Sequence, residues 1–204
     1  MSQRDHDHMR QQLAQRAAQV LLESGSRDFY AAKHKAAHQL GVKDTQSLPN
    51  NSEIELALSE YQRLFRSASQ PEQLSLLREI AIEAMQFLIK FNPRLVGSVL
   101  SGTADMHSVI RLHVFAETVE SIGFYFQDKN IPCVLGERRL RVSADDFETF
   151  STYEFIVDDV RVELLVFLPK QRKIPLSPVD GKPMRRADLA EVELLLNQGS
   201  LRDL

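Results

Sequence analysis

The chain has few of the features that mark secreted, membrane-embedded or strongly basic proteins. It contains a single cysteine, Cys133, and therefore cannot form an internal disulfide. No apolar run approaches the roughly 18 residues of a membrane span, and the longest candidate, residues 80–91, contains Glu83, Gln86 and Lys90. The formal charge of -3 excludes a globally basic nucleic-acid binder. These absences predict a soluble globular protein with no membrane partner.

Leader, repeat and linker signals are missing as well. The first residues, MSQRDHDHMRQQ, are too polar for a signal peptide, so we expect a cytoplasmic location. No internal repeat, low-complexity tract or Ser/Gly-rich linker divides the chain. With 43% hydrophobic and 26% charged residues, its composition is that of an ordinary globular protein with a buried core.

Apolar residues recur at helical spacing throughout the first 92 residues. Ser26 is a candidate N-cap for a helix, Asn50 or Asn51 for another, and Pro71 suits a first helical turn. The apolar surface that follows Pro71 is broad, which is typical of a central buried helix. The spacing predicts four helices, within residues 9–23, 27–40, 48–65 and 69–91.

Beyond Pro93 the pattern becomes extended, with runs rich in β-branched and aromatic residues. Strands are predicted at LVGSVL, VIRLHVF, TYEFIVDD and VRVELLVFL, with a further edge strand in IPCVLGERRLRV. Helices are predicted at ETVESIGFYFQDKN and near the C-terminus. The predicted fold is α+β. A layer of about four helices, residues 1–92, packs on a mixed β-sheet with flanking helices, residues 93–204.

The segment RLVGSVLSGTADMHSVIRLHVF places a strand, a Gly-Ser turn, a loop and a second strand after a helix. That order resembles the nucleotidyltransferase superfamily, which has the polymerase-β-like fold. The resemblance implies that Gly97 and Ser98 cradle the phosphates of a nucleotide. In that family the next strand carries two acidic residues, whose carboxylates point the same way and share a pair of magnesium ions.

The acidic pair of that family is missing from this chain. Aligning its S-D-x-D pattern on Ser108 puts Val109 and Arg111 at the two acidic positions, and neither residue can ligate a metal. Glu163 stands where the resemblance implies the last catalytic carboxylate. No metal site and no cofactor are therefore expected. Magnesium would be required only if the chain were an active enzyme with an irregular site, for which the candidate ligands are Asp105, His107, His113 and Glu163.

The candidate phosphate-binding residues share hydroxyl groups, loop amides or a positive charge. They are Gly97, Ser98, Ser101, Gly102, Thr103, Ser108 and Arg111. The same residue types also make ordinary turns. Arg111 lies on an otherwise apolar strand and needs a partner. Either it forms an ion pair with Glu163, or it binds a phosphate where a metal once neutralised it.

The strings SGTADMHSVIRLHVF, DGKPMRRADLAEVELLL and AAKHKAA extend the likeness over most of the chain. They resemble a group of uncharacterised bacterial nucleotidyltransferase-like proteins, in which an aspartate often stands at the position of Val109. The resemblance implies an ancestry, and it brings no established activity with it.

The remaining candidates have plainer interpretations. His34 and His38 have a spacing that can bind zinc, but a solvated helix face explains them better. Cys133 is interpreted as a small buried apolar residue. The basic residues of the C-terminal half form solvated edges or, if they converge beside Gly97 and Ser98, a phosphate-binding surface. They are Arg138, Arg139, Arg141, Lys170, Arg172, Lys173, Lys182, Arg185 and Arg186.

Three functions remain open at this point. The first is a pseudoenzyme that binds a nucleotide or another phosphate-bearing ligand without transferring it. The second is an active nucleotidyltransferase with an irregular metal site. The third is a scaffold whose N-terminal helices bind a partner or a second copy of the chain. No aromatic side chains alternate with the basic clusters to stack bases, so no nucleic-acid partner is expected.

Overall fold

The computed structural model describes residues 3–24, 28–42, 47–65, 70–105, 107–171 and 173–200. The chain forms two compact units. The helical unit comprises Met1–Gln70 and Pro178–Gly181, and the sheet unit comprises Pro71–Ser177 and Lys182–Leu204. The division falls at Gln70 and not at the predicted residue 92, because the fourth helix belongs to the core of the sheet unit.

The helical unit contains α1 (Gln3–Ser24), α2 (Phe29–Gln39) and α3 (Asn51–Phe65). Small side chains line much of its core, which lets helices approach closely. The buried residues of this core are Leu13, Ala14, Ala17, Ala18, Val20, Leu21, Phe29, Ala32, Ala36, Ala37, Ile54, Ala57 and Leu58. The three helices predicted before residue 66 are therefore confirmed.

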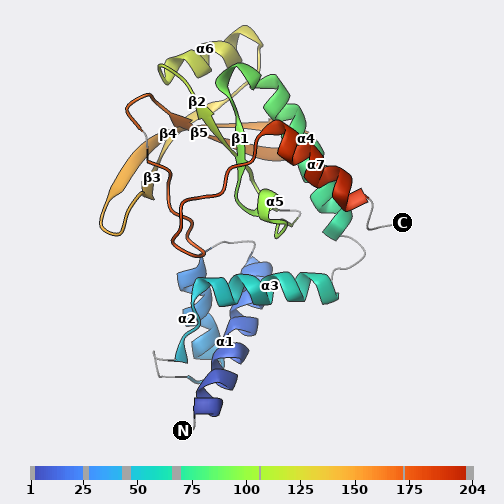
Figure 1. The fold of residues 1–204 in the computed structure, drawn as a ribbon, viewed down its shortest axis with the longest axis vertical. Helices are drawn as coiled ribbons and strands as arrows, with labels where there is room; N and C mark the ends of the chain where they lie inside the picture. Colours follow the sequence, from blue (N-terminus) through green and yellow to red (C-terminus); the bar gives the residue numbers. More distant parts are fainter. Residues whose placement is uncertain are drawn as a thin grey trace. The chain divides into compact units, whose positions relative to one another are not determined.

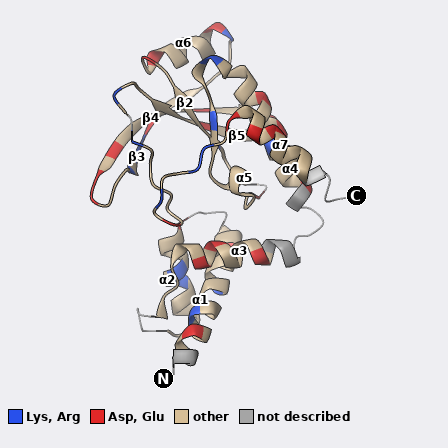
Figure 2. Ribbon diagram, viewed as in Figure 1, with Lys and Arg blue, Asp and Glu red and all other residues tan. Residues whose placement is uncertain are grey.

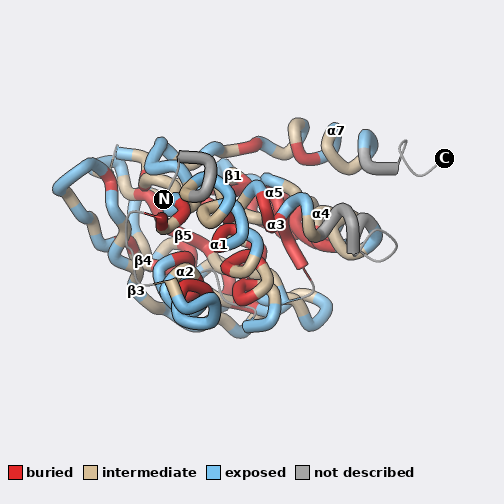
Figure 3. Tube along the Cα trace, turned by 90° about the horizontal axis from the view of Figure 1, so that it is seen from below, coloured by how far each residue is buried: buried red, intermediate tan, exposed pale blue. Residues whose placement is uncertain are grey.

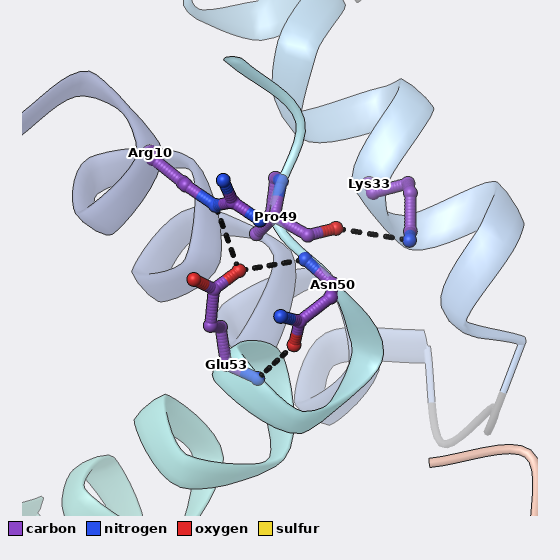
Figure 4. Close-up of polar contacts among 5 residues, drawn as sticks. All are labelled: Arg10, Lys33, Pro49, Asn50 and Glu53. Atoms are coloured by element: carbon purple, nitrogen blue, oxygen red, sulfur yellow. Dashed lines mark hydrogen bonds and ion pairs between the residues drawn. The ribbon is translucent and has the colours of Figure 1, made fainter. Parts of the chain in front are cut away.

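Hydrogen bonds from side chains fix where two of these helices begin. Asp28 caps α2 by accepting a hydrogen bond from the Ala31 amide at 2.9 Å, and the predicted cap Ser26 lies outside the described residues. At α3 the Glu53 amide donates to Asn50 Oδ1 at 2.8 Å, and the Asn50 amide donates to Glu53 Oε2 at 2.7 Å (Figure 4). This reciprocal pair is a capping box.

Glu53 also ties α3 to α1, since Arg10 Nε donates to Glu53 Oε2 at 2.9 Å (Figure 4). Lys33 on α2 donates to the Pro49 carbonyl at 3.0 Å. The turn at Pro178–Gly181 packs with the same helices. Its carbonyls accept hydrogen bonds from the Asn51 and Ser52 side chains, and Val179 lies against their apolar core. Polar contacts thus close the helical unit around its small core.

A five-stranded mixed sheet organises the second unit, with the order β1-β2-β5-β4-β3. The strands are β1 (Arg94–Val96), β2 (Ile110–Phe115), β3 (Val134–Arg141), β4 (Phe147–Val157) and β5 (Val160–Phe167). β2 and β5 run parallel, and the other neighbouring pairs run antiparallel. The α+β architecture with helices first is confirmed, and β3 is the predicted edge strand.

Three helices cover one face of this sheet (Figure 1). They are α4 (Gln70–Phe87), α6 (Glu120–Asp128) and α7 (Leu189–Ser200). Alternate strand residues such as Ile110, Leu112 and Val114 point into the core beneath them. The fourth predicted helix is the central buried one, as expected, and Figure 3 shows buried stretches along α4 and β5.

The extended run predicted at LVGSVL is only partly a strand. β1 ends at Val96, Gly97 takes a positive φ of 77°, and Ser98–Ser101 form the short helix α5. Glycine adopts such a backbone conformation readily, so the chain turns here and buries Val99 and Leu100. After α4, Ile89–Phe91 form a single 3-10 turn before Pro93. No helix in the described part of the chain is long and apolar enough to cross a membrane.

Candidate functional site

The face of the sheet opposite α4 and α6, called here the second face, carries both charged and aromatic side chains. On β2 it bears Arg111, His113 and Phe115, which alternate with the core residues of that strand. On β5 it bears Glu163 and Phe167. A small apolar cluster of Val142, Phe150, Leu165 and Phe167 anchors one end of this face. Arg111, His113 and Glu163, three of the residues singled out in the sequence, therefore share one surface.

Arg111 and Glu163 are directly opposite each other on the parallel strands β2 and β5. Arg111 Nε donates a hydrogen bond to Glu163 Oε2 at 2.9 Å, so the ion pair considered from the sequence is present. Arg138 on β3 reaches the same oxygen, with Nη1 at 2.5 Å from Glu163 Oε2. One carboxylate thus holds two guanidinium groups.

Glu163, Arg111 and Arg138, called here the triad, differ in how far their side chains are exposed. The Glu163 side chain is 19% exposed, whereas Arg111 is 32% and Arg138 is 40% exposed. The carboxylate is therefore the most buried of the three groups, and their formal charge together is positive. Charge-assisted hydrogen bonds of this kind are strong, but the exposed parts of both arginines reduce their contribution to stability.

His113 is the next second-face residue along β2, and it is 2% exposed. Arg186 Nε donates to His113 Nδ1 at 2.9 Å, so the neutral imidazole carries its proton on Nε2. Burial, and then the charge of Arg186, lower the pKa of His113 from 6.5 to about 3. The Nδ1 lone pair is used by Arg186, which removes one of the metal ligands proposed from the sequence.

Arg186 is held against aromatic rings. Its guanidinium carbon lies 4.5 Å from the ring centre of Phe167 and 5.3 Å from that of Phe115. Burial and the nearby charge of Arg94 lower the pKa of Arg186. Among the described residues, Arg186 Nη2 is buried without a hydrogen-bond partner. Cation–π contacts therefore replace part of the solvation that this side chain has lost.

The predicted phosphate-binding residues separate into two groups. Gly97 and Ser98 directly follow Val96, which is opposite Arg111 in the antiparallel pairing of β1 and β2. Gly97 has φ 77° and ψ -151° and open space where a side chain would point. Gly97 and Ser98 are thus brought to the end of β1 beside the start of β2.

The other predicted phosphate-binding residues lie in the segment after Ser98, where they contact neighbouring side chains and backbone. Ser101 Oγ and Thr103 Oγ1 lie 3.0 Å apart, and Thr103 is buried. Gly102 ends α5 and faces side chains of α4. Ser108 Oγ donates to Asp105 Oδ1 at 3.0 Å and accepts from the Asp105 amide at 2.9 Å. These contacts favour the interpretation that these residues form an ordinary turn over the interpretation that they bind a phosphate.

The residues do not fit the paired magnesium ions of a nucleotidyltransferase. Val109 and Arg111 offer no ligand, and Glu163 Oε2 is already held by two guanidiniums. Asp105 accepts a hydrogen bond from the His107 amide at 3.0 Å as part of its loop, while the His107 side chain is exposed. Within the described ranges no three His, Cys, Asp or Glu side chains are grouped so as to hold a metal ion.

The basic clusters converge only in part. Arg138 joins Glu163 and Arg186 joins His113, whereas Lys173 pairs with Asp146 at 2.6 Å on the surface. Arg185 pairs with Glu191, and Arg172 lies outside the described residues. Figure 2, with Lys and Arg in blue, shows basic residues along the segment that leads into α7. The sequence predicted that Arg138 lies on an edge strand. In the sheet Arg138 is opposite Phe150 on β4, and its long side chain reaches along the second face to Glu163.

The remaining candidates show no arrangement for chemistry. The His34 ring packs against Tyr30 on α2, with ring centres 4.3 Å apart. Cys133 is half-buried at the margin of the sheet core, and burial raises the pKa of its thiol. A raised pKa leaves less of the reactive thiolate at neutral pH.

Comparisons with protein-family models, with curated proteins and with solved structures give no match to this chain. The nucleotidyltransferase interpretation therefore depends on the sequence pattern and on the order of the elements around Gly97 and Arg111.

Proposed function

We propose that the sheet unit is a non-catalytic binding module of nucleotidyltransferase type, which holds a nucleotide or another phosphate-bearing ligand at Arg111 and Arg138. The observation that carries the proposal is the convergence of these two arginines on Glu163, at 2.9 and 2.5 Å, on the second face of the sheet. Guanidinium groups match the oxygen geometry of phosphate and carboxylate alike.

The position of the triad favours this function over catalysis. The two guanidiniums supply the positive charge that magnesium would bring, and both are partly exposed. Gly97 lies next to Val96, which is opposite Arg111, and its backbone leaves open space beside it. A phosphate at this point could therefore meet positive charge and backbone amides together. No step of phosphoryl transfer is assigned to these residues.

The test is a thermal-shift titration with inorganic phosphate, pyrophosphate and the four ribonucleoside triphosphates, each in EDTA, magnesium or manganese. A ligand that binds only the folded state raises the melting temperature. The proposal predicts a shift that persists in EDTA and is lost in Arg111→Glu. Arg161→Glu is the control with the same change of charge, because Arg161 lies on β5, is 60% exposed and pairs with Glu154 instead of Glu163.

Two other results would favour an active transferase or a protein-binding scaffold. Release of pyrophosphate that requires magnesium or manganese and disappears in Glu163→Gln would establish an active transferase and overturn the proposal. An absence of any shift with all ligands would also overturn it and would favour a protein-binding scaffold.

A further inference from the structure

We infer that Glu163 is a specificity-determining residue of this anion site, because its carboxylate already accepts the hydrogen bonds that a ligand would take and opposes the charge that a ligand brings. The inference rests on the proposed function and adds a property to it. A catalytic carboxylate would assist the reaction of a bound nucleotide, whereas this carboxylate opposes the binding of every anion.

Glu163 competes with a ligand for the hydrogen-bond donors of Arg111 and Arg138. Its Oε2 atom accepts hydrogen bonds from Arg111 Nε and from Arg138 Nη1. Carboxylates and phosphates present similar oxygens to a guanidinium, so an incoming phosphate and Glu163 compete for the same donors. The two arginines are more exposed than the carboxylate, so a ligand can reach their guanidinium groups from solvent and take over the hydrogen bonds that Glu163 accepts.

Glu154 on the neighbouring strand β4 is a second carboxylate with which Glu163 can be compared. Glu154 on β4 is directly opposite Glu163 on β5, so both carboxylates lie on the second face. Glu154 is 46% exposed, and Arg161 Nε lies 3.8 Å from its Oε1. Its charge is therefore better screened than that of Glu163, and it shares neither of the hydrogen bonds that hold the triad.

The electrostatic cost that Glu163 imposes is proportional to the charge of the ligand. A singly charged phosphodiester meets one repulsion, and the more highly charged pyrophosphate meets several times as much. Replacing Glu163 with glutamine removes the charge and keeps an oxygen that can accept from Arg111. We expect affinity to rise by about tenfold for a singly charged ligand and by about a hundredfold or more for pyrophosphate at low ionic strength.

The experiment is isothermal titration of the unaltered protein, Glu163→Gln and Glu154→Gln with dimethyl phosphate and with pyrophosphate, in EDTA. The inference predicts tighter binding in Glu163→Gln, a larger gain for pyrophosphate, and a clearly smaller gain in Glu154→Gln. Equal or weaker binding in Glu163→Gln would overturn it while leaving the proposed function intact. Failure of every protein to bind either ligand would overturn both.

A second measurement uses the unaltered protein and does not depend on the folding of a variant. The NMR resonance of the Arg111 Nε–H group reports the partner of that hydrogen, which is Glu163 Oε2 in the structure. Saturating pyrophosphate should shift this resonance, because the hydrogen bond passes from the carboxylate to the ligand. A resonance that stays in place when the site is saturated would overturn the competition between ligand and Glu163.

Discussion

The buried imidazole of His113 should make the sheet unit sensitive to acid. Its pKa is about 3 in the folded protein and 6.5 when unperturbed, because burial and Arg186 disfavour the charged form. Between these two values the unfolded chain binds a proton that the folded chain does not. The stabilisation is therefore fully present above pH 6.5 and is lost as the pH falls towards 3.

The size of this effect follows from the pKa difference. One pKa unit corresponds to about 1.4 kcal/mol, so the free energy of unfolding should fall by about 2 kcal/mol between about pH 7.5 and about pH 5 from this residue alone. The full effect at low pH should approach about 5 kcal/mol. These values apply with little screening, because His113 is 2% exposed.

The assay is urea denaturation at a series of pH values for the unaltered protein and for His113→Gln. Glutamine keeps an acceptor for Arg186 but does not titrate, so the difference between the two free energies of unfolding should change by about 1.4 kcal/mol per pH unit below about pH 6. His107→Gln, at an exposed side chain, is the matched control for the substitution itself. A difference between the unaltered protein and His113→Gln that does not vary with pH would refute the reasoning.

Three further substitutions test a close side-chain contact, a helix cap and a backbone conformation. Gly123→Ala would place its Cβ 2.8 Å from the hydroxyl oxygen of buried Tyr153, and we expect a loss of about 1–2 kcal/mol in urea denaturation; an increase in stability would contradict this packing. Glu53→Ala removes the capping box of α3 and should lower the stability of the helical unit by about 1 kcal/mol. Glu60→Ala, at an exposed position of the same helix, leaves the capping box intact and should cost less. Gly97→Ala should cost about 1–3 kcal/mol in melting experiments, because φ 77° strains any other residue, and an unchanged melting temperature would contradict that conformation.

The local pattern of the sequence was sufficient to predict most of the elements. Helical spacing and capping residues such as Asn50 predicted α1 to α4, and alternation predicted β2 and β5, since both signals depend on neighbours close in the chain. The strand predicted at 95–100 failed after Val96, where Gly97 turns the backbone and α5 begins. Apolar residues such as Val99 and Leu100 suit a buried strand or a buried helix equally, so composition alone could not separate them.

Only part of the candidate site could be predicted from the sequence. The resemblance to nucleotidyltransferases implied that Val109 and Arg111 stand at the positions of an acidic pair, and the apolar residues around Arg111 indicated that it needs a partner. The sequence left open whether that partner is Glu163 or a ligand. The parallel register of β2 and β5 brought Arg111 to Glu163, and the side chain of Arg138 on β3 reaches the same carboxylate along the second face of the folded sheet. Pairing between strands far apart in the chain depends on tertiary packing, which no local pattern contains.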